Sequence, residues 1–526
     1  MLSEARAVPK NTVIRTEVCI VGAGAAGITL AREFAGRGFR VCLLESGGFE
    51  YDENTQALYA GENVGLPYFK LDAARLRYFG GSTNHWSGLC RPLDEIDFEQ
   101  RDWVPYSGWP FDKSHLAPFY DRAEVICQLR PGAYDAETWE TETRPRLPFV
   151  QDGVLTQFLQ FSPPTLFGRA YRDEIIRAPN IDVYLNANVV DIETTSTARR
   201  VTRLRVSYLG GDAFWVTGKI FILAAGGIEN PRLLLLSNKV LRTGLGNKND
   251  LVGRFFMEHP HLKSGMVLLS SNLTSLGLYE MQLAPKKVDS ANPGFGSGLG
   301  ALTLSPHILR KEKLLNYSTS LELIPEPGLA AARDLYNAAR EGRIAENFTR
   351  DIKEIIRDMD AVIAGVYRKA LNSGSPPMEG FQLHNRLEQA PNPESRVTLS
   401  EERDSLGLRR VRLDWRLTDL DKRSLRRAHE ILGQEVGRAG LGRFKIELDE
   451  GGGWPSSLMG GFHHMGTTRM GQECERGVVD VNCLVHGISN LYIAGSSVFP
   501  TSGYANPTLT IVALALRLAD HVNRLM

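Results

Sequence analysis

Three glycines near the N-terminus are spaced as in a loop that holds a phosphate. Gly22, Gly24 and Gly27 follow the apolar stretch 17–22 and precede a helical pattern. Gly22 permits a tight turn, Gly24 lets backbone approach a pyrophosphate, and Gly27 lets a helix pack on a strand. Glu45 ends the next apolar stretch, where a carboxylate can hold ribose hydroxyls. The pattern predicts a dinucleotide site, with a purely structural turn as the alternative, and does not separate FAD from NAD.

A second set of polar residues alternates with apolar ones further along the chain. Gln382, His384 and Arg386 would share one face of a strand. We interpret that face as a wall for a polyhydroxylated substrate, or alternatively as an ordinary solvated or internally paired face. Two other histidines, His259 and His261, lie in a short run that we interpret as structural.

Composition limits the class of ligand. Acidic and basic residues balance at 61 each, which argues against a nucleic-acid surface and favours a small molecule. The six cysteines have no metal-site spacing, so no metal is expected. No apolar run of about 18 residues and no signal core is present, so we expect no membrane contact. The sequence predicts a cytoplasmic enzyme, unless it is exported bound to a partner that carries a signal.

The elements that would position these residues can be read from apolar periodicity. The order of strand 17–22, helix 28–38 and strand 39–44 predicts a parallel sheet with a Rossmann-type turn. The stretch 508–525 predicts a helix that packs back on this unit. Alternating stretches predict strands of an antiparallel sheet at 264–270, 317–324, 379–389 and 395–400.

Three stretches together resemble the glucose-methanol-choline (GMC) oxidoreductases. They are the glycine-rich run 80–88, the apolar run 219–238 and the C-terminal run 460–516. The elements HxxGT at 463–467 and NPT at 506–508 are most similar to the sugar-oxidising branch. That branch includes pyranose oxidase, fructose dehydrogenase and enzymes that oxidise glycosides at carbon 3.

The resemblance implies an α/β fold of the GMC or p-hydroxybenzoate hydroxylase type, with FAD as cofactor. A discontinuous substrate domain would be built on an antiparallel sheet plus helices, with a helical insertion at about 327–371. That insertion would cover the sheet, or alternatively form a lid or an oligomer contact. The implied FAD-binding domain comprises 1–110, 185–265 and 440–526, and the substrate domain comprises 111–184 and 266–439.

The resemblance also implies which residues contact FAD. They are Gly22, Gly24, Ala25, Ala26, Gly27, Glu45, Ser46, Gly81, Ser82, Asn84, His85, Trp86, Ser87, Val189, Ala225, Gly226, Gly495, Ser496, Asn506, Pro507 and Thr508. Many family members have an aspartate where this chain has the small run 494–497, so backbone and hydroxyl groups would replace that carboxylate. His85 matches the histidine that bonds covalently to flavin in pyranose oxidase. We expect a dissociable FAD, with a covalent link through His85 as the alternative.

Oxidation of an alcohol needs a base for the hydroxyl proton and a hydride acceptor, which flavin N5 supplies. A histidine suits the base because its unperturbed pKa of about 6.5 leaves it largely neutral. The family's histidine corresponds to His463 and its asparagine partner to Asn506. Consecutive residues on extended backbone point to opposite faces, and the spacing to Gly466 selects His463 over His464. Alternatively, the histidine pair caps a core turn.

The resemblance therefore predicts oxidation of a secondary alcohol of a sugar or glycoside to a ketone. Oxygen, a quinone or another acceptor would take the electrons, and a homo-oligomer is possible. One alternative is a non-sugar substrate, such as an aliphatic or sterol alcohol. Another is a non-redox or photochemical reaction on the same scaffold.

Overall fold

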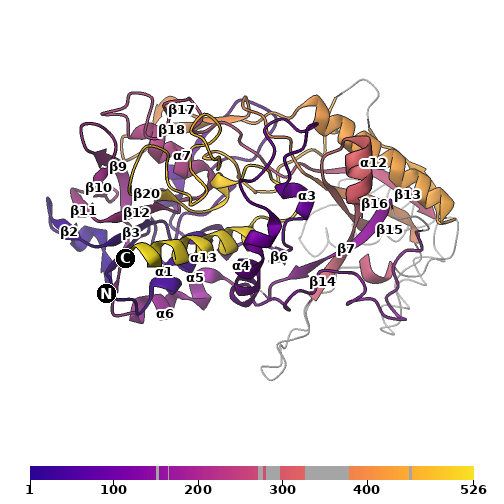
Figure 1. Cartoon of the computed structure of the whole chain (residues 1–526), viewed down its shortest axis with the longest axis horizontal. Helices are drawn as coiled ribbons and strands as arrows, with labels where there is room; N and C mark the ends of the chain where they lie inside the picture. Colours follow the sequence, from indigo (N-terminus) through magenta and orange to yellow (C-terminus); the bar gives the residue numbers. More distant parts are fainter. Residues whose placement is uncertain (150–152, 164, 270–275, 280–296, 326–377, 449–452) are drawn as a thin grey trace, which may run out of the picture.

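A computed structural model of the chain describes residues 1–149, 153–163, 165–269, 276–279, 297–325, 378–448 and 453–526 (Figure 1). The helical insertion expected at about 327–371 lies outside the described residues. Figure 1 places a parallel sheet toward one end of the long axis and an antiparallel sheet toward the other. No helix in the described part of the chain is long and apolar enough to cross a membrane.

The parallel sheet has six strands, and its central strands are apolar and fully buried. This burial is typical of parallel sheets that helices cover on both faces. The strand order is β1 (Leu2–Glu4), β8 (Ile181–Leu185), β4 (Val41–Leu44), β3 (Val18–Val21), β12 (Ile220–Leu223) and β20 (Leu491–Ile493). The Rossmann-type sheet predicted from the sequence is confirmed.

Helices cover this sheet and point their N-termini at its carboxyl edge. Helix α1 (Ala25–Phe34) follows β3, and α7 (Gly226–Leu236) follows β12. The last helix, α13 (Thr508–Leu525), has the bounds predicted from the sequence and packs against α1 and α4 (Lys113–Ile126). Figure 1 shows α13 in yellow beside both of these helices. The helix therefore closes back on the first βαβ unit, as expected.

The antiparallel sheet has seven strands, and α12 (Asp419–Arg438) packs its apolar side chains against it. Leu425 and Ile431 of α12 share a core with Val267 and Phe381 of the sheet. The strand order is β19 (Gly442–Lys445), β13 (His261–Leu269), β16 (Met378–Leu387), β15 (Tyr317–Pro325), β14 (Ser297–Leu304), β7 (Val154–Phe161) and β6 (Leu89–Cys90). The antiparallel sheet expected for the substrate side is confirmed.

One predicted strand belongs elsewhere. The stretch 395–400 forms β17 (Arg396–Arg403), which pairs with β18 (Arg409–Asp414) in a three-stranded sheet completed by β5 (Gly61–Asn63). Val397 of β17 packs with Trp415 in a separate small core, and this packing takes the strand away from the seven-stranded sheet. The domain boundaries stay a prediction.

The remaining elements are short and lie at the periphery or in connections. A four-stranded sheet has the order β2 (Val13–Arg15), β11 (Ala213–Thr217), β10 (Val201–Ser207) and β9 (Asn188–Thr194). The other α-helices are α2 (Glu53–Gln56), α3 (Glu95–Phe98), α5 (Phe167–Ala170), α6 (Arg172–Arg177) and α8 (Pro306–Glu312). Single 3-10 turns occur at 5–7, 57–59, 81–84, 277–279 and 496–498.

Candidate active site

A cavity of about 670 Å³ opens at the carboxyl edge of the parallel sheet. Segments that are far apart in the sequence line it, as expected for a ligand site at the edge of a doubly wound sheet. The predicted residues that line it are Gly22, Gly24, Ala25, Ala26, Glu45, Ser46, Gly81, Ser82, His85, Trp86, Ser87, Val189, Ala225, Gly226, His463, Gly495, Ser496, Asn506, Pro507 and Thr508. The structure thus brings most of the predicted positions to one cavity.

Two of the predicted cofactor residues do not line the cavity. A Cβ on Gly27 would lie 1.8 Å from the carbonyl oxygen of Gly22, so Gly27 allows α1 to pack against the turn. Asn84 donates from Nδ2 to the carbonyl oxygen of Phe79 at 2.9 Å and holds its own loop. These two residues shape the site without facing it.

Glu45 ties the glycine turn to the end of β4. Its Oε2 accepts from the backbone N–H of Ala23 at 2.8 Å, and its Oε1 accepts from the backbone N–H of Gly47 at 2.9 Å. A carboxylate oxygen has further lone pairs, so each oxygen can also accept from a ribose hydroxyl. Gly22 has φ +103°, which an L-residue rarely adopts, and its missing Cβ leaves room for the carbonyl of Ala224.

The empty space of the cavity fits FAD. Cβ atoms built on Gly24, Gly226 and Gly495 would meet nothing within 4 Å, so all three backbones border open space. Glycines of this kind let a backbone approach a phosphate or a ring closely. Asn506, which also lines the cavity, has a buried Oδ1 without a hydrogen-bond partner among the described residues. An unsatisfied buried polar atom is costly, and a bound cofactor or substrate would satisfy it.

His463 contacts a second histidine through Nδ1. Its Nδ1 lies 2.9 Å from Nδ1 of His259, whose Nε2 lies 3.3 Å from the carbonyl oxygen of Ser502. A carbonyl oxygen only accepts, so Nε2 of His259 carries the proton and its Nδ1 accepts. His463 must then donate from Nδ1, and its Nε2 keeps the lone pair. Within the described residues no hydrogen bond reaches that Nε2.

Both of these histidines are neutral near pH 7. Burial lowers the pKa of His259 to about 4. Burial, with further contributions from His259 and His261, lowers the pKa of His463 well below its usual value of 6.5. A neutral imidazole with a lone pair toward the cavity has the protonation state that a general base requires.

His464 points to different partners. Its Nε2 lies 2.9 Å from the hydroxyl oxygen of Tyr68, and that hydroxyl donates in turn to Glu258. Tyr68 therefore accepts from Nε2–H of His464, so this nitrogen has no free lone pair. The imidazole packs on Phe256 with ring centroids 5.9 Å apart, and burial lowers its pKa to about 3. His464 also lines the cavity, but its ring packs against the aromatic rings of Phe256 and Tyr68.

Glu258 holds the segment that carries both histidines. Its carboxyl group is fully buried and accepts from the backbone N–H groups of Gly461 at 2.9 Å and His463 at 3.0 Å. Burial raises the pKa of Glu258 to about 7, although these donors and Tyr68 favour the charged form. Sequence reasoning missed Glu258 and Tyr68, and its structural interpretation of His259 was incomplete. A carboxylate within the apolar run that precedes His259 was the available signal.

The backbone immediately before His463 is strained. Phe462 has φ +62°, a left-handed conformation that costs a bulky L-residue roughly 1 to 2 kcal/mol. Its ring stacks on Phe69 with centroids 4.3 Å apart, remains half exposed and lines the cavity. The turn therefore presents an aromatic surface beside His463.

The three predicted substrate residues share one face of β16, as expected. Gln382 donates from Nε2 to Glu447 at 3.2 Å. The ring of His384 lies 5.6 Å from that of His261, which lies 6.1 Å from the ring of His463. None of the three lines the 670 Å³ cavity, but the face reaches His463 through His261. No group of three or more His, Cys, Asp or Glu in the described ranges could hold a metal ion.

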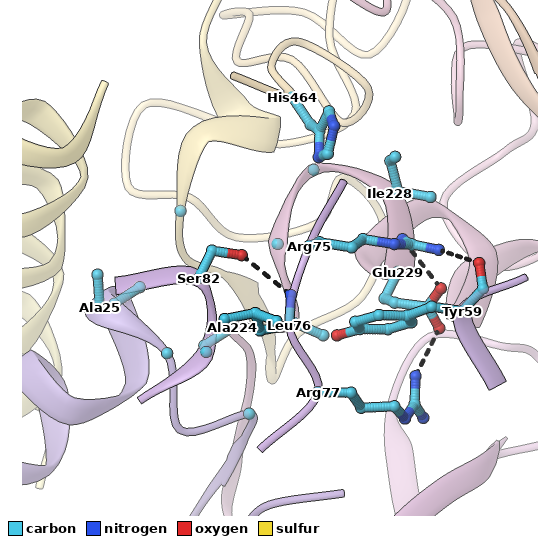
Figure 2. A pocket seen from close by; sticks show the side chains of 18 of the residues that line it. Ala25, Tyr59, Arg75, Leu76, Arg77, Ser82, Ala224, Ile228, Glu229 and His464 are labelled. Carbon is cyan, nitrogen blue, oxygen red and sulfur yellow. Dashed lines mark hydrogen bonds and ion pairs between the residues drawn. The ribbon is translucent and has the colours of Figure 1, made fainter. Parts of the chain in front are cut away.

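A charged network that the sequence did not predict lines one wall of the cavity (Figure 2). Arg75 and Arg77 both pair with Glu229, with N–O distances of 3.2 and 3.5 Å. Arg75 also lies over the ring of Tyr59 at 4.0 Å. Although burial raises the pKa of Glu229, Arg232 and these two arginines lower it to about 2. The network is a rigid, charged wall whose acid is fully ionised.

His85 and Trp86 lie in the loop that borders the cavity. His85 is exposed and lines the cavity, whereas Trp86 donates from Nε1 to the carbonyl oxygen of Thr165 at 3.1 Å. This bond fixes the loop, so His85 faces the space where FAD would bind. Whether His85 carries a covalent flavin stays a prediction.

Two family models match the chain. A GMC oxidoreductase model matches residues 391–515, and an FAD-dependent oxidoreductase model matches residues 17–243. The chain is 23% identical to the 2-methyl-1,2-propanediol dehydrogenase of Mycolicibacterium austroafricanum, over 97% of this chain and 95% of that protein. It is also 23% identical to the fructose dehydrogenase large subunit of Gluconobacter japonicus, over 97% and 98%.

A solved structure of formate oxidase has a similar fold. It aligns with a TM-score of 0.55 at 16% identity, over 98% of this chain and 99% of that chain. The two family models together cover the glycine turn, every strand of the parallel sheet except β1, and the segment of His463 and Asn506. With the cavity that fits FAD, these matches show an FAD-dependent oxidoreductase whose C-terminal part, residues 391–515, matches the GMC oxidoreductases.

Proposed function

We propose that the protein oxidises a secondary alcohol of a sugar or glycoside to a ketone, with His463 as the general base and Asn506 as its partner. The observation that carries this proposal is the contact between His463 and His259. Because His259 accepts at Nδ1, the remaining lone pair of His463 is on Nε2, the atom without a partner in the described residues. The similarity to fructose dehydrogenase supports a sugar substrate.

The residues divide the reaction between them. His463 takes the hydroxyl proton at Nε2 and holds it on a ring whose other nitrogen is bonded to His259. Asn506 donates from its amide to the substrate oxygen and adds no charge. Bound FAD supplies the hydride acceptor, so the carbinol carbon loses a hydride and the substrate leaves as a ketone. Oxygen, a quinone or another electron acceptor then takes the two electrons.

Anaerobic reduction of the flavin tests the proposal directly. We expect at least one free sugar or glycoside to bleach the yellow absorbance of the oxidised flavin. The matched comparison is a panel of aliphatic diols and sterols at equal concentration. If only the diols or sterols bleach the flavin, the sugar assignment is wrong and the oxidation chemistry stands.

A second candidate substrate class has one specific observation in its favour. The chain has the same identity, 23%, to a dehydrogenase of 2-methyl-1,2-propanediol as to the sugar relative. A small aliphatic alcohol is therefore the runner-up within the same chemistry. Net non-redox or photochemical reactions on this scaffold are a separate class, which flavin bleaching in the dark by an alcohol would exclude.

We also propose that the FAD is dissociable. His85 is exposed beside the cavity, but position alone does not make a bond to flavin. Acid precipitation decides between the two forms. Yellow colour in the supernatant supports the dissociable form, whereas colour that stays with the parent protein and is lost in His85→Ala establishes the link.

A further inference from the structure

Arg386 is a cation without an acidic partner beside His463. Its Nη1 is buried and has no hydrogen-bond partner, and no ion pair of Arg386 occurs in the described ranges. Burial lowers its pKa to about 10, so the guanidinium stays charged near pH 7. A buried charge is unfavourable unless it is paired and hydrogen-bonded. Among the described residues, no acidic group therefore neutralises this positive charge.

The acidic residues nearest along the sheet are paired with other groups. Glu322 pairs with Lys263 at 2.5 Å, and Glu447 pairs with Lys445 at 3.2 Å. Glu388, two residues beyond Arg386, accepts from both terminal nitrogens of Arg101 and from the backbone N–H of Asn316.

The groups that do face Arg386 are imidazoles. Arg386 lies opposite His261 in the register of β16 and β13, and His384 lies two residues away on the same face. The charge of Arg386 contributes to the lowered pKa of His259, His261, His384 and His463. The buried Nε2 of His261 also has no hydrogen-bond partner. Among the described residues, the cross-strand neighbours Arg386 and His261 thus each have one unsatisfied buried nitrogen, and the ring of His261 lies 6.1 Å from that of His463.

The side chain of Arg386 as a whole is only partly buried, although Nη1 itself is covered. A planar guanidinium binds a carboxylate or a phosphate through two parallel hydrogen bonds, which makes it more selective than a point charge. An alcohol group held by Arg386 alone would leave the positive charge unneutralised.

We propose that Arg386, with His261 beside it, binds an anionic group of the substrate, so that the sugar or glycoside is an acidic one. This proposal rests on the proposed function for the oxidation, but it concerns a part of the substrate other than the hydroxyl group that is oxidised. The anionic group is a carboxylate, as in a uronic acid, or a phosphate, since both fit a guanidinium. An anion bound there also offsets the charge that lowers the pKa of His463, so binding strengthens the base.

Calorimetric titration of the holoenzyme with three probes tests the proposal without relying on turnover. The probes are methyl glucoside, methyl glucuronide and glucose 6-phosphate. We expect one anionic probe to bind at least about tenfold more tightly than methyl glucoside, the scale of charge-assisted hydrogen bonds. Which of the two anions binds separates the carboxylate from the phosphate.

Variants of Arg386 assign the effect to this residue. Arg386→Gln is expected to weaken the preferred anionic probe by about 10- to 100-fold and to leave methyl glucoside within about twofold. Arg386→Lys keeps the charge but loses the two parallel hydrogen bonds. Its affinity for the anionic probe should therefore lie between those of the parent and Arg386→Gln. Arg443→Gln, an exposed arginine on β19 of the same sheet, is the matched control for lost charge.

The outcomes separate this proposal from the proposed function. Equal affinity for neutral and anionic probes in the parent, or equal losses for both in Arg386→Gln, overturns the anionic site. If neutral sugars still bleach the flavin in that case, the proposed oxidation stands. Conversely, tight binding of an anion through Arg386 without any bleaching by sugars supports the site and rejects the oxidation. FAD absorbance per chain shows whether each variant has folded.

Discussion

His463 and His464 are consecutive residues that enter opposite environments. The ring of His463 lies among imidazoles, and the charge of Arg386, which has no ion pair among the described residues, contributes to its lowered pKa. His464 lies among aromatic rings and is linked through Tyr68 to the carboxyl group of Glu258. The difference teaches that two consecutive residues can separate the environment of the proposed base from that of a structural side chain. Residue type alone does not tell them apart.

Replacing each histidine in turn is the strongest way to break this comparison. We expect His463→Ala and Asn506→Ala to keep the yellow cofactor but to slow flavin reduction by about 100-fold or more, the scale of a lost base or oxyanion partner. His464→Gln, which still donates to Tyr68, should slow it by less than about tenfold. Anaerobic stopped-flow absorbance measures all three. A parent-like rate in His463→Ala with a slow His464→Gln would reverse the assignment.

Variants of His259 sharpen the comparison because the ring of His259 contacts His463. His259→Asn places an amide oxygen near the former Nδ1 and can still accept from His463, whereas His259→Leu cannot. We expect the leucine variant to slow flavin reduction by about tenfold, as for one lost hydrogen bond to a reacting group. The asparagine variant should recover most of the rate. Equal rates in the two variants at every pH would show that His259 only fills space.

The stability of the protein at low pH should show a smaller effect, which arises from His464. Burial lowers the pKa of His464 to about 3, so the folded protein stays unprotonated there while the unfolded chain binds a proton below about 6.5. The contribution of the neutral His464 to the free energy of unfolding is fully present above pH 6.5. It is lost as the pH falls toward 3, at up to about 1.4 kcal/mol per pH unit. Urea midpoints of the holoenzyme should therefore fall less steeply with acid in His464→Gln.

The shifted pKa of Glu258 changes the free energy of unfolding with pH in the opposite direction. Its effect must therefore be separated from that of His464. Its folded pKa is raised to about 7, so its contribution is present below about 4.5 and is lost as the pH rises through 7. Both enzymes in the comparison retain Glu258, so the difference between their curves isolates His464. Identical acid limbs in the parent and His464→Gln would contradict the buried neutral imidazole.

The smallest expected effect lies on the cofactor side, away from both histidines. Glu45→Ala should weaken FAD retention during dialysis without changing which alcohols reduce the remaining flavin. The backbone N–H groups of Ala23 in the glycine turn and of Gly47 after β4 would each lose a partner, so part of the effect is a looser turn. The ratio of bound FAD to protein measures it. Full occupancy after prolonged dialysis would count against Glu45 as a ribose ligand.

Local patterns were sufficient for the elements of the parallel sheet. Strands 18–21 and 41–44 and the helix 508–525 followed from apolar periodicity and the glycine turn, because each is fixed by neighbouring residues. The roles of His259 and Glu258 could not be predicted, since each depends on contacts about 200 residues away. That Arg386 has no acidic partner among the described residues likewise appears only from their three-dimensional arrangement. The residue-by-residue FAD contacts and the domain boundaries stay predictions.

The order of strands in the parallel sheet has a kinetic consequence. Strand β12 pairs with β3 on one side and β20 on the other, so Phe221 lies opposite both Cys19 and Leu491. Closing chain loops of this length loses much entropy before any contact compensates, which makes folding slow. Residues that follow β3 and residues that follow β20 both line the cavity. FAD can therefore bind only after these strands have paired with β12. Added flavin should raise the yield of late refolding and leave the early phases unchanged.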